Sequence, residues 1–217
     1  MDQDSSIRSI SRALGILRAI NRTGSLTLTE IAKAVDVPYA TALRIVRALV
    51  TEGVIEREPD RKRYRPTALV QSLAYGFQNH DQLVVTARPH IIALTQEVYW
   101  PISIVNRVGN AMVVRDSTST QTPLTFNHYY PGWQVPLTVS ASGRAFLAHS
   151  HPNVRKELIE YFRADASSAE LATLTAFEEA GEAEKIVAQG YAAAARTGYS
   201  ANPGKTSSLA VPLFIGE

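Results

Sequence analysis

Basic side chains recur within one short stretch of the chain, between Thr27 and Pro66. Arg44 and Arg47 lie in a segment whose apolar residues recur at helical intervals, so both arginines fall on the face opposite the apolar one. The run from Arg61 to Arg63 follows, between two short segments that resemble strands. Arginine can reach guanine edges in a DNA groove, and basic side chains also bind phosphates. The chemistry that this stretch predicts is recognition of duplex DNA.

A helix-turn-helix is predicted to position these arginines. Thr27 and Glu30 have the spacing of a capping box, which begins a short helix. That helix ends near Asp36, where the chain turns sharply; Asp tolerates the left-handed backbone better than most residues. Pro38 opens a second helix, where its missing N–H costs nothing. The second helix runs to Val50, and its expected inner stripe consists of Leu43, Val46, Leu49 and Val50.

A basic hairpin follows this second helix. Residues 54–57 and 63–66 are predicted as two short strands, and the order helix, turn, helix, hairpin is that of a winged helix-turn-helix. Tyr39 and Thr41 are expected to contact the DNA backbone or a thymine methyl group, and the wing to hold phosphates. The complete set of candidate DNA-binding residues is Thr27, Pro38, Tyr39, Ala40, Thr41, Arg44, Arg47, Arg61, Lys62 and Arg63.

The charge distribution agrees with this interpretation. Residues 1–75 hold 12 Lys and Arg against 8 Asp and Glu, whereas residues 76–217 hold 10 against 12. The basic excess thus lies in the segment with the DNA-binding pattern. The chain has no Cys, which excludes disulfides and Cys-based metal sites, and its polar, acidic start does not resemble a secretory signal. We therefore expect a cytoplasmic protein without a cofactor, a metal or a membrane segment.

Further helices are expected on both sides of the DNA-binding segment. Residues 9–21 carry a helical stripe of Ile10, Leu14, Leu17 and Ile20, and residues 67–77 place Leu69, Leu73 and Phe77 on one face. A polar break at 79–82 precedes a helix over 83–97 that contains Pro89, which either starts or kinks it. These helices either form a dimer or cover the small domain.

The second half of the chain predicts strands and then helices. A hairpin is expected around Gly109 and Asn110. Further strands are expected at 122–126, 133–137, 191–195 and 207–214, with helices at 141–149, 153–162 and 171–189. This order predicts an α+β domain built on an antiparallel sheet.

Over most of its length the chain resembles the IclR family of bacterial transcriptional regulators. The resemblance rests on Ser9–Leu14 with Leu17, on the helix-turn-helix and wing, and most specifically on Pro131–Leu137 running into Ala141–Leu147. Within the family, Val98–Pro101 and Ala111–Arg115 look most like the regulators of hydroxyphenylpropionate catabolism.

The resemblance implies three parts: a winged helix-turn-helix DNA-binding domain at 1–78, a linker helix at 79–98, and a GAF-like effector-binding domain at 99–217. It also implies homodimers or tetramers on a palindromic operator, controlled by a small organic acid or aromatic effector. The effector-binding residues carried over by position are Leu124, Phe126, Asn127, Ala141, Ser142, Gly143 and Ser208. Arg115 or Arg144 can pair with an effector carboxylate or form an ordinary ion pair. Because members of the family continue beyond this point, we expect the second domain to be incomplete at its C-terminus.

Two other functions compete with the regulator. An enzyme is disfavoured because the chain lacks the nucleophile-elbow, phosphate-loop and zinc-protease motifs. His149 and His151 form a close pair without an obvious carboxylate ligand, so they are more simply a solvated helix end than a metal site. A winged helix can also serve as a protein-interaction module that does not bind DNA.

Overall fold

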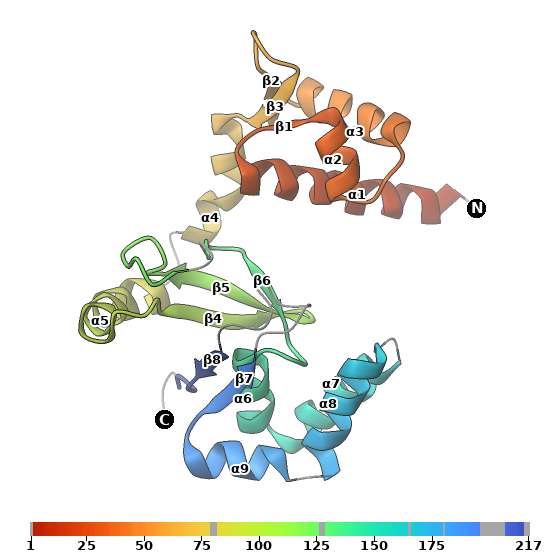
Figure 1. Cartoon of the computed structure of the whole chain (residues 1–217). Coiled ribbons are helices and arrows are strands. Elements are labelled where there is room, and N and C mark those ends of the chain that lie inside the picture. The colour runs from red at the N-terminus through yellow and green to blue at the C-terminus, as the bar shows by residue number, and fades with distance from the viewer. Residues whose placement is uncertain are drawn as a thin grey trace. The chain divides into compact units, whose positions relative to one another are not determined.

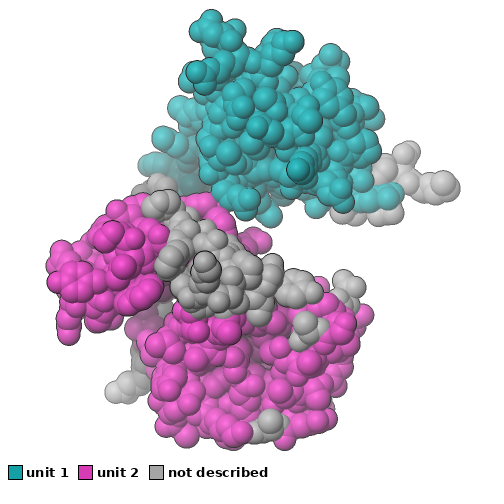
Figure 2. All heavy atoms as spheres, in the orientation of Figure 1, with its two compact units in different colours: residues 1–81 teal, residues 82–217 magenta. Residues whose placement is uncertain are grey.

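The computed structural model describes residues 2–78, 82–125, 129–164, 166–179, 181–195 and 207–214. The chain folds as two compact units, residues 1–81 and 82–217, which Figure 2 distinguishes by colour. Each unit has its own cluster of buried apolar side chains. The first unit carries a helix-turn-helix and a wing, and the second combines helices with antiparallel strands, so the expected α+β class is confirmed.

The first unit is a winged helix-turn-helix. Its wing is an antiparallel sheet in which β3 lies between β1 and β2, and Figure 1 shows the β2–β3 hairpin projecting from the helices. The elements are, in order, α1 (Asp2–Thr23), β1 (Leu26–Thr27), α2 (Leu28–Ala34), α3 (Tyr39–Thr51), β2 (Ile55–Arg57), β3 (Arg63–Pro66), the 3-10 helix η1 (Ala68–Ala74) and α4 (Tyr75–Gln78).

Local signals set the geometry of α2 and α3. The N–H of Glu30 donates to the Thr27 hydroxyl at 3.3 Å, and the N–H of Thr27 donates to Glu30 Oε2 at 2.7 Å, which completes the capping box. Asp36 adopts the left-handed conformation with a φ of 50°, as the turn requires. Pro38 caps α3 rather than forming its first residue. The predictions for this part of the sequence are therefore confirmed to within one residue.

The apolar face of α1 differs from the expected one. Ile16 and Ile20 are fully buried, whereas Ile10 and Leu14 are exposed. Figure 1 shows the N-terminal part of α1 extending beyond α2 and α3, and Ile10 and Leu14 lie outside the buried cluster of this unit. On α3, Ala42 and Val46 are buried and Leu43 and Leu49 pack against the same core, whereas Val50, which was expected in the inner stripe, is exposed near the end of the helix.

The segment after the wing is also different from the expected single helix. Residues 68–74 form the 3-10 helix η1, and only 75–78 are α-helical. Leu69, Leu73 and Phe77 are exposed in this unit. The prediction of one apolar helix face from the four-residue spacing was therefore wrong, since that spacing assumes α-helical geometry throughout.

The second unit combines two small antiparallel sheets with helices. One sheet has the strand order β4-β5-β6, and the other pairs β7 with β8. The elements are α5 (Gln82–Val98), β4 (Ser103–Val108), β5 (Ala111–Ser117), β6 (Gln134–Pro136), α6 (Ala141–His149), α7 (Pro152–Arg163), α8 (Ser168–Glu179), α9 (Glu182–Gln189), β7 (Ala192–Ala195) and β8 (Ser207–Ala210). The hairpin at Gly109 and Asn110 joins β4 to β5 as predicted.

Three sequence predictions for this unit were wrong in detail. Residues 122–125 form no strand, and Phe126 lies outside the described residues. The helix expected over 171–189 is divided into α8 and α9 by Gly181, whose φ of 59° interrupts the helix. Strand β8 ends at Ala210 instead of Phe214, because Pro212 has no N–H for a ladder hydrogen bond.

A close backbone approach fixes α6 against the segment that follows β6. A Cβ atom on Gly143 would lie 1.9 Å from the Leu137 carbonyl oxygen and 2.7 Å from the Leu137 Cα. Leu137, Ala145 and Leu147 are buried together in the core of the unit. Glycine is therefore required at position 143 by packing, whatever else this position does.

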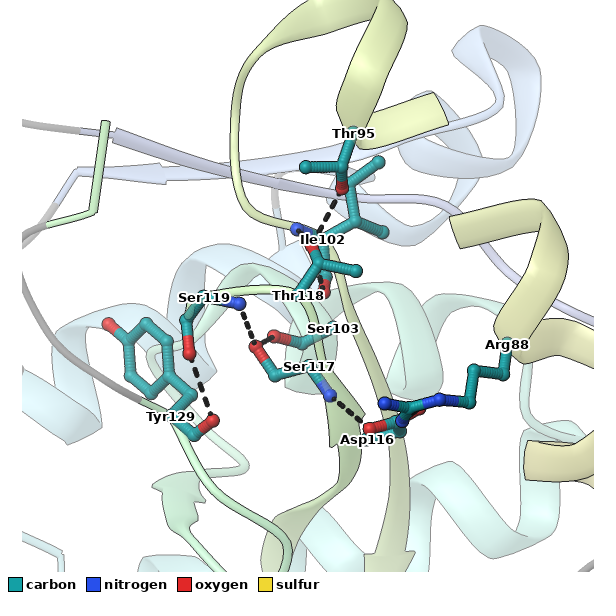
Figure 3. Close-up of polar contacts among 9 residues, drawn as sticks. All are labelled: Arg88, Thr95, Ile102, Ser103, Asp116, Ser117, Thr118, Ser119 and Tyr129. Atoms are coloured by element: carbon teal, nitrogen blue, oxygen red, sulfur yellow. Dashed lines mark hydrogen bonds and ion pairs between the residues drawn. The ribbon is translucent and has the colours of Figure 1, made fainter. Parts of the chain in front are cut away.

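Helix α5 is attached to the β4–β5 hairpin by polar contacts (Figure 3). Arg88 forms an ion pair with the buried carboxylate of Asp116, and the hydroxyls of Thr95 and Thr118 lie 2.6 Å apart. Thr118 also accepts a hydrogen bond from the N–H of Ile102 at 2.9 Å. Figure 3 shows Arg88 and Thr95 both reaching from α5 toward the end of β5. Helix α5 thus packs on the β4–β5 hairpin within the second compact unit.

We expect Gly143→Ala to lower the free energy of unfolding by about 3 kcal/mol, because backbone atoms of Leu137 must move to admit the methyl group. Urea titration followed by tryptophan fluorescence measures this effect in the second unit, which contains both Trp100 and Trp133. Ser142→Ala is the control on the same helix, with an expected loss below about 1 kcal/mol. Equal stability of Gly143→Ala and the unmodified chain would contradict the close approach.

Arg88→Ala should lower the free energy of unfolding by about 1–3 kcal/mol, because it leaves the Asp116 carboxylate without its cation. The Asp116 side chain is 8% exposed, whereas Arg88 is half-exposed, so the loss is smaller than for a fully buried pair. Lys156→Ala, which breaks the exposed pair with Glu160, should cost no more than about 0.5 kcal/mol. The same urea titration compares the two, and equal losses would refute the structural role of the Arg88 pair.

Candidate nucleic-acid interface

The outer face of α3 presents polar and basic side chains. Tyr39, Ala40, Arg44 and Arg47 are exposed and Thr41 is half-buried, while Ala42 and Val46 face the core. Among the residues that the structure describes, neither Arg44 nor Arg47 uses its guanidinium in an ion pair or hydrogen bond. Two cations spaced three residues apart are thus available to a ligand beside this helix.

The N-terminus of α3 is also available. Pro38 is its N-cap and provides no side-chain hydrogen bond, and the N–H groups of Thr41 and Ala42 bond to the Pro38 carbonyl. The first-turn N–H groups of a helix without a side-chain cap attract anions such as phosphate. The exposed Tyr39 ring lies at the same end of the helix.

The wing carries a second basic group at its tip. Arg61 and Lys62 are exposed in the turn between β2 and β3, and no ion pair of either residue is found within the described part of the chain. Arg65 is paired with Glu56 at 2.7 Å. At the wing tip, Arg61 and Lys62 are therefore available to a phosphate, as is the exposed Arg57 on β2.

Two of the predicted DNA-binding side chains also make contacts within the unit. Thr27 belongs to the capping box of α2, and Arg63 contacts Ser25 and Glu30. Hydrogen bonds from Thr27, with the Arg63 charge as a lesser cause, lower the pKa of the Glu30 carboxyl. The contacts of Ser25 and Arg63 were missed from the sequence, because the two residues are 38 positions apart and no local pattern links them.

The residues predicted to bind an effector are distributed over α6, β8 and a loop. Ala141 and Gly143 are buried at the start of α6, which packs against β7 and β8, and Leu124 is exposed in the loop after β5. Ser208 lies on β8, where its hydroxyl donates to the Ala194 carbonyl at 3.4 Å. Phe126 and Asn127 lie outside the described residues.

The start of α6 is already capped. The Ser140 hydroxyl accepts a hydrogen bond from the Gly143 N–H at 3.0 Å and lies 3.2 Å from the Ser142 hydroxyl. The expected free N–H groups thus include one that is occupied, namely that of Gly143. The Arg144 guanidinium binds the Glu182 carboxylate and the Ala193 carbonyl, so its ion pair is internal to the unit.

A surface cavity of about 370 Å³ lies elsewhere in the second unit. None of its lining residues is a predicted effector residue; they are Asn110, Thr138, Tyr161, Phe162, Ala164, Ala166 and Glu170. Hydrogen bonds from Ser167, and a weaker one from Thr138, lower the pKa of Glu170. Since these bonds cap α8, the carboxylate has a structural explanation that needs no ligand.

The two histidines considered as metal ligands have other contacts. The Nδ1 atom of His151 accepts a hydrogen bond from the Asn153 N–H at the start of α7, and the His149 ring packs edge-on against Phe214. Within the described ranges, no three His, Asp or Glu side chains come together as metal ligands would. None of the helices in the same ranges has both the length and the apolar character of a membrane span.

Comparison with known proteins agrees with the geometry of the first unit. The family model of the IclR helix-turn-helix domain matches residues 9–59. The transcriptional regulator BhcR of Paracoccus denitrificans is 29% identical over 196 residues, which cover 88% of this chain and 68% of that protein. The probable transcriptional regulator SauR of Cupriavidus necator is 28% identical over 162 residues, covering 75% of this chain and 63% of that protein. The chain thus spans about two thirds of these relatives.

A solved structure shares the fold over nearly the whole chain. It is an IclR homologue from Microbacterium hydrocarbonoxydans in complex with 4-hydroxybenzoate, with a TM-score of 0.66 and 22% identity over 95% of this chain and 83% of that one. Both curated relatives are named transcriptional regulators rather than enzymes. The matched helix-turn-helix model, the regulators that align with most of the chain and the basic face of α3 agree: residues 9–59 are an IclR helix-turn-helix domain, and most of the chain is similar to IclR-type transcriptional regulators.

Proposed function

We propose that this protein binds operator DNA through α3 and the wing, under the control of a small organic-acid or aromatic effector held by the second unit. The observation that carries the DNA-binding part is the exposed outer face of α3, on which Arg44 and Arg47 have no ion pair within the described residues. A helix with this pattern enters the major groove with its N-terminal residues at the base edges.

Each exposed group has a role in this arrangement. Arg44 and Arg47 contact bases or phosphates, and Tyr39 and Thr41 contact the backbone or a thymine methyl group. Arg61 and Lys62, at the wing tip, hold phosphates. The uncapped N-terminus of α3 adds a phosphate site.

The proposed effector site is formed by Leu124, Ala141–Gly143 and Ser208, together with Phe126 and Asn127. Ser142 and Ser208 supply hydroxyl groups, and Leu124 supplies an apolar contact. The IclR homologue bound to 4-hydroxybenzoate supports an aromatic acid as the ligand class. Such a ligand changes DNA binding only if it binds two arrangements of the protein unequally.

The proposal extends to assembly and context. The protein acts in the cytoplasm as a homodimer or tetramer on a palindromic operator that lies beside a catabolic operon. Residues 1–78 serve as the DNA-binding domain, 79–98 as the linker helix and 99–217 as the effector domain. The alternative is a winged helix that binds another protein, and the exposed cations of α3 favour DNA over it.

Binding to duplex DNA at increasing salt tests the DNA-binding part. In fluorescence anisotropy, the logarithm of the binding constant should fall linearly with the logarithm of the salt concentration, with a slope of about 0.9 per phosphate neutralised. A lack of binding at low salt would refute the proposal and favour the protein-interaction module.

Arg44→Ala should weaken binding by about 1–3 kcal/mol if Arg44 reads a base, and should lower discrimination between the operator and random DNA. The same anisotropy assay measures both effects. Lys156→Ala removes one exposed positive charge from the second unit and serves as the control, with unchanged affinity expected. If both variants bind as the unmodified chain does, Arg44 has no part in recognition.

An effector that binds the native state of the second unit should raise its free energy of unfolding by about 2.7 kcal/mol at a free concentration of 100 times its Kd, and so raise its melting temperature. We expect this shift when 4-hydroxybenzoate or a related aromatic acid is added. The same ligand should produce a smaller shift in the double variant Ser142→Ala, Ser208→Ala. Thermal denaturation followed by tryptophan fluorescence measures it. A response to short keto acids alone would assign the site to aliphatic acids instead.

A further inference from the structure

The guanidinium of Arg63 lies at the base of the wing, where it contacts the segment before α2. Its Nε donates to the Ser25 hydroxyl at 3.1 Å, and its Nη2 donates to the Ser25 carbonyl at 2.9 Å. The same Nη2 lies 3.1 Å from Glu30 Oε2, in the first turn of α2. Arg63 thus joins β3 to the start of the helix-turn-helix.

Both ends of the wing tip meet at Ser25. The Ser25 hydroxyl donates to Glu58 Oε1 at 2.6 Å, and the Glu58 N–H donates to the Arg63 carbonyl at 2.9 Å. Glu58 and Arg63 bracket the turn that carries Arg61 and Lys62. The position of these two cations relative to α2 and α3 is therefore determined by contacts at Ser25.

The charge of Arg63 is compensated within the unit, unlike those of the wing tip. The Glu30 carboxylate is adjacent, and its pKa is lowered by hydrogen bonds from Thr27, so it stays ionised over a wider pH range. Arg63 is 31% exposed, and three of its contacts would be lost if it turned toward a phosphate. Arg61 and Lys62 have no such compensation among the described residues.

We infer that Arg63 is a positioning residue, which with Ser25 holds the wing so that Arg61 and Lys62 reach the DNA backbone, and that it does not itself bind phosphate. This inference rests on the proposed DNA-binding function. It removes one residue from the expected set of DNA contacts and adds Ser25, which touches no DNA, to the residues that determine affinity.

Ser25→Ala separates the two roles, because it leaves every charge in place. We expect binding to one duplex of fixed sequence at low salt to weaken several-fold, since the wing tip loses its anchor. Ser25→Thr keeps a hydroxyl at the same place and should restore most of the affinity. If Arg63 binds phosphate directly, Ser25→Ala leaves the affinity unchanged, and that result would overturn the inference. Far-UV circular dichroism at the assay temperature checks that both variants remain folded.

A second comparison uses Arg63→Gln with and without the tip cations. In the unmodified chain, Arg63→Gln should weaken binding several-fold. In the Arg61→Ala, Lys62→Ala background it should have no further effect, because no tip cation remains to be positioned. A direct phosphate contact would instead remain additive there and reduce the salt slope by a further amount of about 0.9. Absence of binding by the unmodified chain would refute the proposed function itself, so the two failures are distinguishable.

Discussion

The carboxylate of Glu30 joins the helix-turn-helix to the wing. It accepts the Thr27 N–H that completes the capping box of α2, and it also pairs with the Arg63 guanidinium. One side chain thus contacts both the start of α2 and strand β3, which also pairs with β1 and β2 through its backbone. Because α3 packs directly on α2, the direction of α3 and the position of the wing depend on this junction. The exposed cations of the first unit would otherwise be a basic surface without a defined geometry.

The second unit depends on a different constraint, which is the close approach of two backbone segments at a glycine. The backbone of Leu137 occupies the place of a Cβ on Gly143, so α6 and the segment before it can approach to contact. Some polar groups near the sheet are satisfied in pairs, such as Thr95 with Thr118. Part of the predicted effector site is therefore also part of the core. Gly143, which the family resemblance assigns to the effector site, is therefore also needed for the packing of α6.

Short-range features were predictable from the sequence because their causes are local. The Thr27 capping box, the left-handed turn at Asp36 and the bounds of α6 each follow from a few adjacent residues. Burial was less predictable: Ile10 and Ile20 occupy similar positions in the pattern of α1, yet only Ile20 has a core beside it. The contacts of Arg63 depend on the tertiary fold, so a basic side chain in a basic run was assigned to DNA although its partners lie within the protein. The predicted effector residues remain proposals, since nothing local determines which side chains a ligand meets.

Pro212, which ends strand β8, has a consequence for self-association. Leu209, Val211 and Leu213 alternate along this segment and are exposed within the described part of the chain. An exposed strand with an apolar face is a template onto which a strand from another molecule can add, as in amyloid growth. Proline cannot donate the hydrogen bond that such an added strand needs, and it interrupts the segment in the middle of its apolar run. Pro212 therefore removes one donor from the ladder that an added strand would need along this apolar segment.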